Sequence, residues 1–306
     1  MKTMFITARA NPEAMADLFR AELPDHDIVT VAPTDRPVAY AVVGKPLPST
    51  LSGLQGLELV LSLNAGVEHL LSSGEVPDAV PIVRMVDPGL VDGMVEWVAA
   101  QVLAWHRNLF VYHAQQVAGI WQTHPEMMAP ERTVTVLGAG ALGGPVAAML
   151  AAIGFKVRTW SRSGRAVPGT ETFGADGLAA AVTGANMLVN LLPATAQTID
   201  LIDAALLARL APGALLVNGG RGASVVDDDL VAALDKGQLG WAVLDVFRTE
   251  PLPGDHAFWA HPKVFVSPHV AAPTHARTAV AVMAESVRMF ERGAPVPHSV
   301  DRTLGY

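Results

Sequence analysis

A glycine-rich turn near the middle of the sequence constrains the fold more than any other stretch. Residues 134–137 form the short apolar run Val-Thr-Val-Leu, which leads directly into Gly-Ala-Gly-Ala-Leu-Gly at 138–143. An alanine-rich run follows over residues 145–152, and Gly154 ends it. This order predicts a strand, a tight turn and a helix, with the G-x-G-x-x-G pattern of a dinucleotide-binding site at the junction.

Each glycine of this turn has a predicted task. Gly138 permits the tight turn, Gly140 lets a pyrophosphate approach the backbone, and Gly143 lets the helix pack closely on the strand. The helix N-terminus supplies free N–H groups and a partial positive charge for the phosphates. A purely structural glycine turn is the alternative, but a second β-rich run at 155–160 favours the nucleotide site. The predicted phosphate loop comprises Gly138, Gly140, Ala141, Leu142 and Gly143.

Composition limits the classes of protein that the chain can represent. Its 306 residues suit two domains, and 51% hydrophobic residues allow sizeable cores. A net charge of −8 and the lack of a Lys/Arg run argue against nucleic-acid binding. The absence of cysteine excludes disulfides, thiol catalysis and thiolate metal ligands. No signal-like segment or long apolar run occurs, so we expect a cytoplasmic protein without a membrane partner.

Short apolar runs alternate with helix-like segments along the chain, which predicts an α/β fold with parallel sheets covered on both faces. We expect residues 1–95, completed by 275–306, to form one domain, and residues 96–274 to form the nucleotide-binding domain. A long amphipathic segment from Leu90 to about His113 is the predicted connecting helix.

Polar residues follow the later predicted strands. In an open parallel sheet, ligands bind at the carboxyl ends of the strands, so catalytic and binding groups are expected there. The residues predicted at those ends are Pro193, Arg221, Asp245 and His269.

Three motifs connect this edge to a known family. Arg221 lies in Asn-Gly-Gly-Arg-Gly, Glu250 in Asp-Val-Phe-Arg-Thr-Glu-Pro, and His269 in Ser-Pro-His-Val-Ala-Ala. With these motifs in this order and the glycine turn near the middle, the chain resembles the D-isomer-specific 2-hydroxyacid dehydrogenase family over nearly its whole length. Residues 87–97 and 160–163 look like its glyoxylate/hydroxypyruvate reductase A branch. The resemblance implies a Rossmann-type doubly wound domain inserted in a flavodoxin-like substrate domain.

The resemblance also implies roles for individual residues. Arg221, Glu250 and His269 would be the catalytic residues of 2-keto acid reduction. The chemistry agrees, because imidazole exchanges protons near neutral pH, a carboxylate can fix its ring, and a guanidinium fork matches a carboxylate together with a keto oxygen. Gly66 and Val67, in a loop of the first domain, would hold the substrate carboxylate together with Arg221 and His269.

Structural alternatives exist for these residues. In another context, an arginine beside glycines could merely cap a strand. A glutamate before proline could be a turn residue, and a histidine after proline could be a surface residue. Gly66 could be an ordinary turn glycine, and Lys45 is left open between a substrate contact and a solvated lysine. No metal is expected, because the histidines show no ligand spacing and H-E-x-x-H is absent. The lack of G-x-S-x-G argues against a hydrolase.

The stretch after the second strand predicts which nicotinamide cofactor is used. NAD enzymes place an acid there for the ribose 2′-hydroxyl, whereas this chain has Trp-Ser-Arg-Ser at 160–163. Arg162 can pair with a 2′-phosphate, which favours NADP(H) over NAD(H). The alternative is a solvated turn arginine and use of either cofactor. The predicted cofactor contacts beyond the glycine turn are Trp160, Ser161, Arg162, Ser163, Leu192, Pro193 and Asp245, the last on the nicotinamide carboxamide.

Together these features predict NADPH-dependent reduction of glyoxylate or hydroxypyruvate, with His269 as proton donor. One alternative is a dehydrogenase of the same fold for a bulkier 2-keto acid. Another is a dinucleotide-sensing scaffold, like the related C-terminal-binding corepressors. A homodimer is expected from the family, and the segment from Leu90 and the stretch 117–128 with Trp121 are candidates for its interface.

Overall fold

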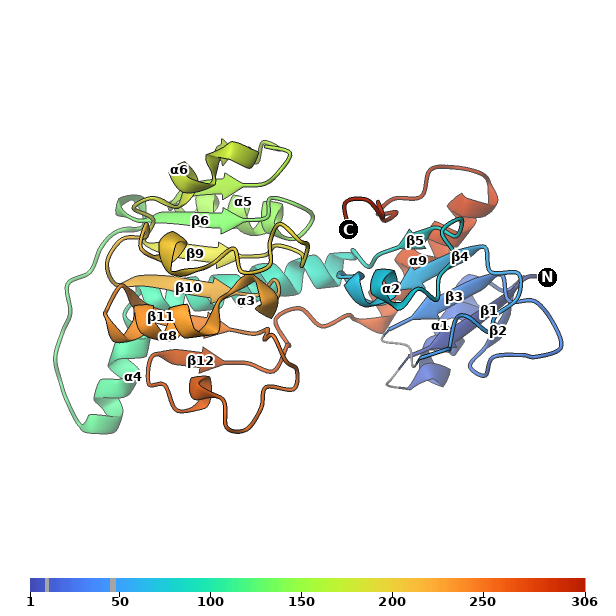
Figure 1. Ribbon diagram of the computed structural model, residues 1–306, viewed down its shortest axis with the longest axis horizontal. Coiled ribbons are helices and arrows are strands. Elements are labelled where there is room, and N and C mark those ends of the chain that lie inside the picture. Colours follow the sequence, from blue (N-terminus) through green and yellow to red (C-terminus); the bar gives the residue numbers. More distant parts are fainter. Residues whose placement is uncertain (9–10, 45–47, 306) are drawn as a thin grey trace. The chain divides into compact units, whose positions relative to one another are not determined.

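The computed structural model describes residues 1–8, 11–44 and 48–305 (Figure 1). The chain forms two compact units, one of residues 1–90 with 274–306 and the other of residues 91–273. The first division lies at Leu90 and not at residue 95, because helix α3 (Pro88–His106) places Met94 and Val98 in the core of the second unit.

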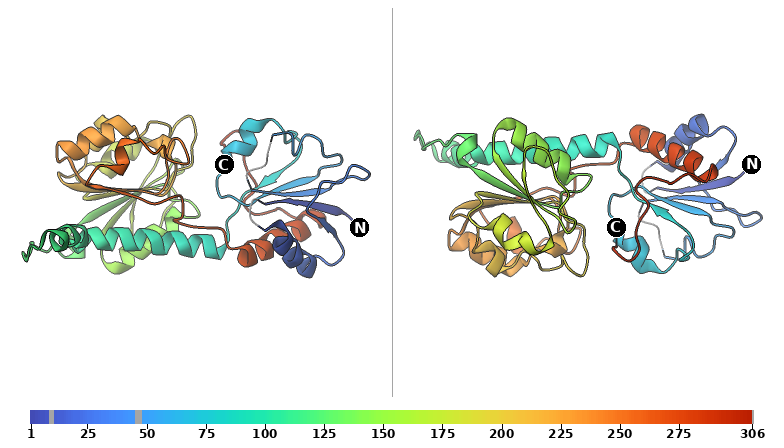
Figure 2. Two further views of the ribbon diagram at one scale, coloured as in Figure 1. Left: turned by 90° about the horizontal axis from the view of Figure 1, so that it is seen from below. Right: turned by 90° about the horizontal axis from the view of Figure 1, so that it is seen from above.

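Five parallel strands form the sheet of the first unit in the order β2-β1-β3-β4-β5, the order of flavodoxin-like folds. They are β1 (Thr3–Thr7), β2 (Asp27–Val29), β3 (Tyr40–Val43), β4 (Leu59–Ser62) and β5 (Ile82–Val83). Helices α1 (Pro12–Glu22) and α9 (Ala276–Glu291) lie side by side on one face, and α2 (Glu68–Ser73) lies on the other (Figure 2). The C-terminal segment therefore completes the unit that the N-terminal segment begins.

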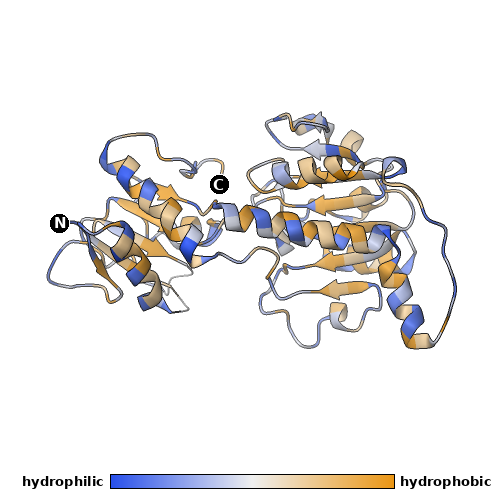
Figure 3. Ribbon diagram, turned by 180° about the vertical axis from the view of Figure 1, so that it is seen from behind, coloured by the Kyte–Doolittle hydropathy of each residue, from blue (hydrophilic) through white to orange (hydrophobic). Residues whose placement is uncertain are grey.

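The sequence of each element matches its surroundings. All residues of β3 and β4 are buried, and both strands are nearly continuous apolar runs, as expected for parallel strands covered on two faces. Helix α1 is amphipathic, with Phe19 on its buried face, and the Asn11 side chain caps it by accepting a hydrogen bond from the Ala14 N–H. Figure 3 shows this contrast between apolar strands and mixed helices.

A partly buried hydrogen bond joins β3 to α9. Tyr40 is fully buried, and its hydroxyl donates to Glu291 Oε1 at 2.9 Å. His26 Nε2 lies 3.0 Å from the same oxygen. Burial raises the pKa of Tyr40 to about 12, with the bond to Glu291 adding to the effect and Lys2 opposing it.

Replacing Tyr40 by Phe should lower the free energy of unfolding by about 1 kcal/mol near neutral pH, because this bond is lost. The difference should shrink as the pH rises from 10 towards 12. In that range the phenol of the unfolded chain ionises first while the folded phenol stays protonated, so only the wild type loses this contribution. Urea unfolding of both proteins across this range is the measurement, and parallel pH profiles would contradict the prediction.

Seven parallel strands form the sheet of the second unit, in the order β12-β11-β10-β9-β6-β7-β8. They are β6 (Thr133–Leu137), β7 (Lys156–Trp160), β8 (Glu171–Phe173), β9 (Met187–Asn190), β10 (Ala214–Asn218), β11 (Leu239–Leu244) and β12 (Val264–Val266). The order reverses between β6 and β9, which is the topological switch point where doubly wound sheets bind ligands. The predicted α/β class with a Rossmann-type unit is confirmed.

Helices cover both faces of this sheet (Figure 2). Alternate strand residues feed two cores: Val134 and Val136 pack on the α3 side, whereas Leu137 packs on the other. The remaining α-helices of the unit are α4 (Leu109–Ala118), α5 (Gly143–Ile153), α6 (Leu178–Val182), α7 (Ala204–Leu207) and α8 (Asp227–Asp235). Short 3₁₀ turns lie at Ala129–Glu131, Ala175–Gly177, Gly222–Ser224 and Ala257–Trp259.

The prediction of one helix from Leu90 to about His113 is wrong, because two helices form there. α3 ends at His106, and α4 begins at Leu109. Between them Asn108 adopts left-handed backbone, with φ of 56°, which asparagine tolerates better than most residues and which redirects the chain. α4 contains no fully buried residue: Phe110 packs partly against the core on the α3 side, whereas Leu109 and Val117 are exposed.

Candidate active site

The glycine turn follows β6 at the switch point of the sheet. Gly138 has φ of +98°, and a Cβ there would lie 2.8 Å from the carbonyl oxygen of Leu191. A Cβ on Gly143 would lie 1.8 Å from the Gly138 oxygen, so this close packing of helix on strand requires glycine. At Gly140 a Cβ would meet no described atom within 4 Å. The backbone of Gly140 therefore faces open space.

This turn carries the donors that a phosphate needs. The N–H groups of Ala141 and Leu142 donate no hydrogen bond within the described part of the chain. Both residues immediately precede α5, whose N-terminus bears a partial positive charge. Unpaired donors beside the open backbone of Gly140 fit the pyrophosphate of a dinucleotide.

A second tight turn follows β7, which ends at Trp160. The Gly164 N–H donates to the Ser161 carbonyl at 3.1 Å, and the intervening Arg162 and Ser163 are exposed. The Ser161 hydroxyl is buried and has no hydrogen-bond partner among the described residues. The turn contains no carboxylate that would repel a phosphate, and it presents a guanidinium.

Two buried asparagines join the loops after β9 and β10. The Asn190 amide donates to Asn218 Oδ1 at 2.9 Å, and Asn190 Oδ1 accepts from the Leu192 N–H at 3.3 Å. Gly220 brings the backbones together, because a Cβ there would lie 2.8 Å from the Leu192 carbonyl oxygen. The loop of Leu192 and Pro193 is therefore packed directly on the loop that follows β10.

Arg221 lies in this second loop and is half-buried. Its Nη1 donates to the Gly220 carbonyl at 2.7 Å. The next residue, Gly222, touches the following loop, since a Cβ there would lie 1.9 Å from the carbonyl carbon of Phe247. Backbone contact thus couples the loop of Arg221 to the loop that leads to Glu250.

Glu250 and His269 are in contact. His269 Nδ1 lies 2.8 Å from Glu250 Oε2, and the other carboxylate oxygen accepts from the Phe247 N–H at 3.0 Å. The carboxylate is therefore held from both sides. The His269 side chain remains 54% exposed, so its ring is accessible to a ligand. Its backbone is left-handed, with φ of 54°, which is uncommon for a residue other than glycine.

Asp245 holds the loop that bears His269. Its carboxylate is buried and accepts hydrogen bonds from the Ser267 hydroxyl at 2.6 Å and from the N–H groups of Val270 and Ala271, each at 2.9 Å. Its carbonyl accepts from the His269 N–H at 2.9 Å. The predicted contact of Asp245 with a nicotinamide stays a prediction, while its contacts with this loop are direct.

Comparison with known proteins identifies the family. A sequence profile described as D-isomer specific 2-hydroxyacid dehydrogenase, NAD binding domain, matches residues 99–271. The chain belongs to the D-isomer specific 2-hydroxyacid dehydrogenase family. Among its relatives, glyoxylate/hydroxypyruvate reductase A from Klebsiella pneumoniae subsp. pneumoniae is 42% identical over 278 residues, 89% of each chain. The corresponding protein from Serratia proteamaculans is 41% identical, again over 89% of each chain.

Solved structures of this family have the same fold. An NADPH-dependent glyoxylate/hydroxypyruvate reductase from Sinorhizobium meliloti, crystallised with NADP and sulfate, has a TM-score of 0.94 at 37% identity and covers 100% of both chains. A D-isomer specific 2-hydroxyacid dehydrogenase from Xanthobacter autotrophicus Py2, crystallised with NADPH and MES, has a TM-score of 0.94 at 35% identity, covering 100% of this chain and 99% of that one. The predicted family and its reductase A branch are thus confirmed.

The remaining predicted residues of this dehydrogenase lie in the first unit. Gly66 and Val67 connect β4 to α2, and their N–H groups donate no hydrogen bond within the described residues. Asn64 and His69 flank them, and each side chain contacts the carbonyl oxygen of Gly44, at 3.1 and 2.9 Å. Lys45 lies outside the described residues.

Sequence reasoning missed the groups that join the loops of this site. Asn190 and Asn218 end apolar strands yet are fully buried, and a polar residue closing an apolar run is the signal that could have found them. Gly220 and Gly222 were noted only as neighbours of Arg221. Their task, backbone contact with the adjacent loops, depends on which strands are neighbours in the sheet.

The described ranges contain neither a candidate metal site nor a membrane-spanning helix. No group of three or more His, Cys, Asp or Glu side chains is arranged to hold a metal ion. No described helix is both long and apolar enough to span a membrane.

Replacing Asp245 by Asn should lower the free energy of unfolding of the cofactor-free protein by about 2 kcal/mol. The amide has one acceptor oxygen, so the N–H group of either Val270 or Ala271 would face an NH₂ group. Asp255→Asn makes the same change of charge at an exposed position and is the control. Urea unfolding measures both variants, and equal stabilities would show that the carboxylate does not hold the loop.

Proposed function

We propose that this chain reduces small 2-keto acids with NADPH, converting glyoxylate to glycolate and hydroxypyruvate to glycerate. The observation that carries the proposal is the contact of Glu250 with an accessible His269, on loops at the same sheet edge as a dinucleotide-type glycine turn. Relatives named glyoxylate/hydroxypyruvate reductase A, and a structural neighbour of that activity, support the choice of substrate.

The reaction needs a hydride for the carbonyl carbon and a proton for the carbonyl oxygen. Bound NADPH supplies the hydride. His269 donates the proton from Nε2, because Nδ1 is engaged by Glu250. Glu250 fixes the orientation of the ring through Nδ1 and leaves Nε2 for the substrate. Arg221 pairs with the substrate carboxylate and polarises the keto oxygen, for which a planar fork of donors is suited.

The residues proposed for the cofactor divide along its length. Gly138, Gly140 and Gly143, with the N–H groups of Ala141 and Leu142, would hold the pyrophosphate. Arg162, with Trp160, Ser161 and Ser163, would contact the adenosine ribose and its 2′-phosphate. Leu192, Pro193 and Asp245 would lie near the nicotinamide. The neighbours crystallised with NADP or NADPH support NADP(H) over NAD(H).

Further parts of the proposal concern the substrate and the assembly. The unpaired N–H groups of Gly66 and Val67 support a role in holding the substrate carboxylate. We also propose a homodimer, supported by exposed apolar residues on and after α4, among them Leu109, Val117 and Trp121. A cytoplasmic location and the absence of nucleic-acid partners stay predictions.

The direct test is loss of reduced-nicotinamide absorbance with NADPH or NADH and glyoxylate, hydroxypyruvate or pyruvate. We expect the fastest loss with NADPH and one of the first two acids. His269→Ala should lower kcat by about a hundredfold or more, the usual contribution of a positioned acid. His261→Ala is the control, because His261 precedes β12 at the opposite end of the strands. Turnover of none of these acids, or an unaffected His269→Ala variant, would refute the proposal.

Replacing Arg162 by Ala should raise the KM for NADPH about tenfold or more and leave the KM for NADH within twofold. A hydrogen bond from a guanidinium to a phosphate is charge-assisted, so its loss weakens binding of NADPH. NADH lacks the 2′-phosphate and therefore cannot make this bond with either protein. NADH therefore serves as the internal control in steady-state kinetics. Equal changes for both cofactors would mean that Arg162 does not select between them.

A further inference from the structure

Arg248 lies in the catalytic region but has no role in the chemistry described above. It is two residues before Glu250, in the loop after β11. Its side chain donates to the backbone of the neighbouring loop, which follows β10. Nε donates to the Val225 carbonyl at 3.0 Å, and Nη2 donates to the carbonyls of Val225 and Ala223, the latter at 3.3 Å.

These carbonyls belong to the turn that begins immediately after Arg221. Ala223 lies in the 3₁₀ turn at Gly222–Ser224, and Val225 follows it. The same turn contacts Phe247 through Gly222. Arg248 therefore adds side-chain bonds to an existing backbone contact, and the two loops that carry Arg221 and Glu250 are joined at both places.

A third loop is joined by the same guanidinium. Asp200, in the segment after β9, pairs with Arg248 Nη2. The Asp200 N–H donates to the Ala223 carbonyl at 2.9 Å, so this segment also contacts the turn directly. From the segment after β11, one side chain thus bonds to the segments that follow the two next strands in the sheet, β10 and β9.

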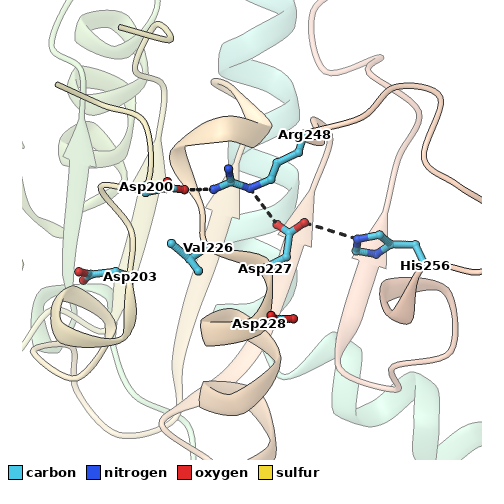
Figure 4. Close-up of a pocket in the computed structure, with 7 residues that line it drawn as sticks. All are labelled: Asp200, Asp203, Val226, Asp227, Asp228, Arg248 and His256. Carbon is cyan, nitrogen blue, oxygen red and sulfur yellow. Dashed lines mark hydrogen bonds and ion pairs between the residues drawn. The ribbon is translucent and has the colours of Figure 1, made fainter. Parts of the chain in front are cut away.

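Charges around Arg248 favour its position. Figure 4 shows the guanidinium between Asp200 and Asp227, with His256 on the far side of Asp227. Arg248 Nε lies 3.9 Å from Asp227 Oδ1, and His256 Nε2 lies 3.4 Å from Asp227 Oδ2. These residues line a pocket of about 600 Å³ that also contains Asp203 and Asp228. Burial raises the pKa of Asp227, and Arg248 and His256 counteract this effect.

We infer that Arg248 is a positioning residue, which holds the Arg221 and Glu250 loops in the arrangement that 2-keto acid reduction requires. Arginine suits this task because its fork of fixed donors can serve several acceptors at once, whereas a lysine ammonium is a single flexible point charge. The inference rests on the proposed function, since Arg221 and Glu250 are catalytic only in that reaction.

The test is Arg248→Met, which keeps much of the apolar stem and removes all donors. We expect kcat for the preferred 2-keto acid to fall about tenfold and its KM to rise about fivefold, because small displacements of catalytic groups are costly. The Kd for NADPH should stay within twofold, as the glycine turn is not contacted. Arg248→Lys should recover part of kcat, since it retains the charge beside Asp200 and a donor for one carbonyl.

Arg158→Met is the matched control. Arg158 also pairs with a carboxylate, Glu171, and donates to a backbone carbonyl, that of Thr183, in the same unit. Its contacts lie among β7, β8 and α6, away from the catalytic loops. This variant should lose thermal stability as Arg248→Met does, yet keep kcat and both KM values within twofold of wild type.

A second readout does not depend on turnover. The NMR signal of the His269 ring Cε1–H, assigned with His269→Gln, should move in Arg248→Met and not in Arg158→Met, because Glu250 is displaced only in the first. If Arg248→Met does not fold, Asp200→Asn takes its place. It should change kcat, KM and the His269 signal in the same directions but by smaller amounts.

The outcomes separate the two proposals. An active wild type with kcat and KM unchanged in Arg248→Met would overturn the positioning role and leave the function intact. A wild type that reduces none of the acids would refute the function. In that case the His269 signal decides whether Arg248 orders these loops, and an unmoved signal would overturn the inference as well.

Discussion

Close backbone packing between loops at one sheet edge is the constraint on which the rest of the site depends. Gly138 approaches Leu191, Gly220 approaches Leu192, and Gly222 approaches Phe247, each at a distance that leaves no room for a Cβ. These contacts link the loops after β6, β9, β10 and β11 in the order in which the strands lie in the sheet. A glycine is therefore required at each junction, and main-chain contacts set the spacing of the loops that carry Arg221 and Glu250.

Polar side chains then fix the direction of each loop. Asn190 and Asn218 pair at the junction of the loops after β9 and β10. Arg248 bonds to the carbonyls beyond Arg221, and Asp245 accepts from the N–H groups around His269. The asparagines and Asp245 are buried, so loss of a partner would leave a buried polar group unsatisfied. Glycine contacts set how close the loops come, and these bonds set how they are oriented.

The sequence predicted much of this arrangement, for physical reasons that also explain its failures. The glycine turn and the strand ends carrying Arg221 and His269 were predictable because strand, turn and helix are encoded by neighbouring residues. The break between α3 and α4 at Asn108 was not predictable. An asparagine within a segment of helical apolar spacing gives no sign that its backbone will be left-handed. The contacts of Arg248 and the asparagine pair join residues that are distant in sequence, and only the strand order brings them together.

The geometry also explains why His269 depends on its loop more than on its ion pair. Its side chain is 54% exposed and that of Glu250 is 35% exposed, so solvent screens the attraction between them and the pair contributes little to holding the chain in place. The backbone at His269 is nevertheless left-handed, a conformation that costs about 1 kcal/mol or more outside glycine. Asp245 offsets that cost with bonds on both sides of the histidine. The buried aspartate thus fixes where the imidazole stands, and Glu250 fixes how its ring is turned.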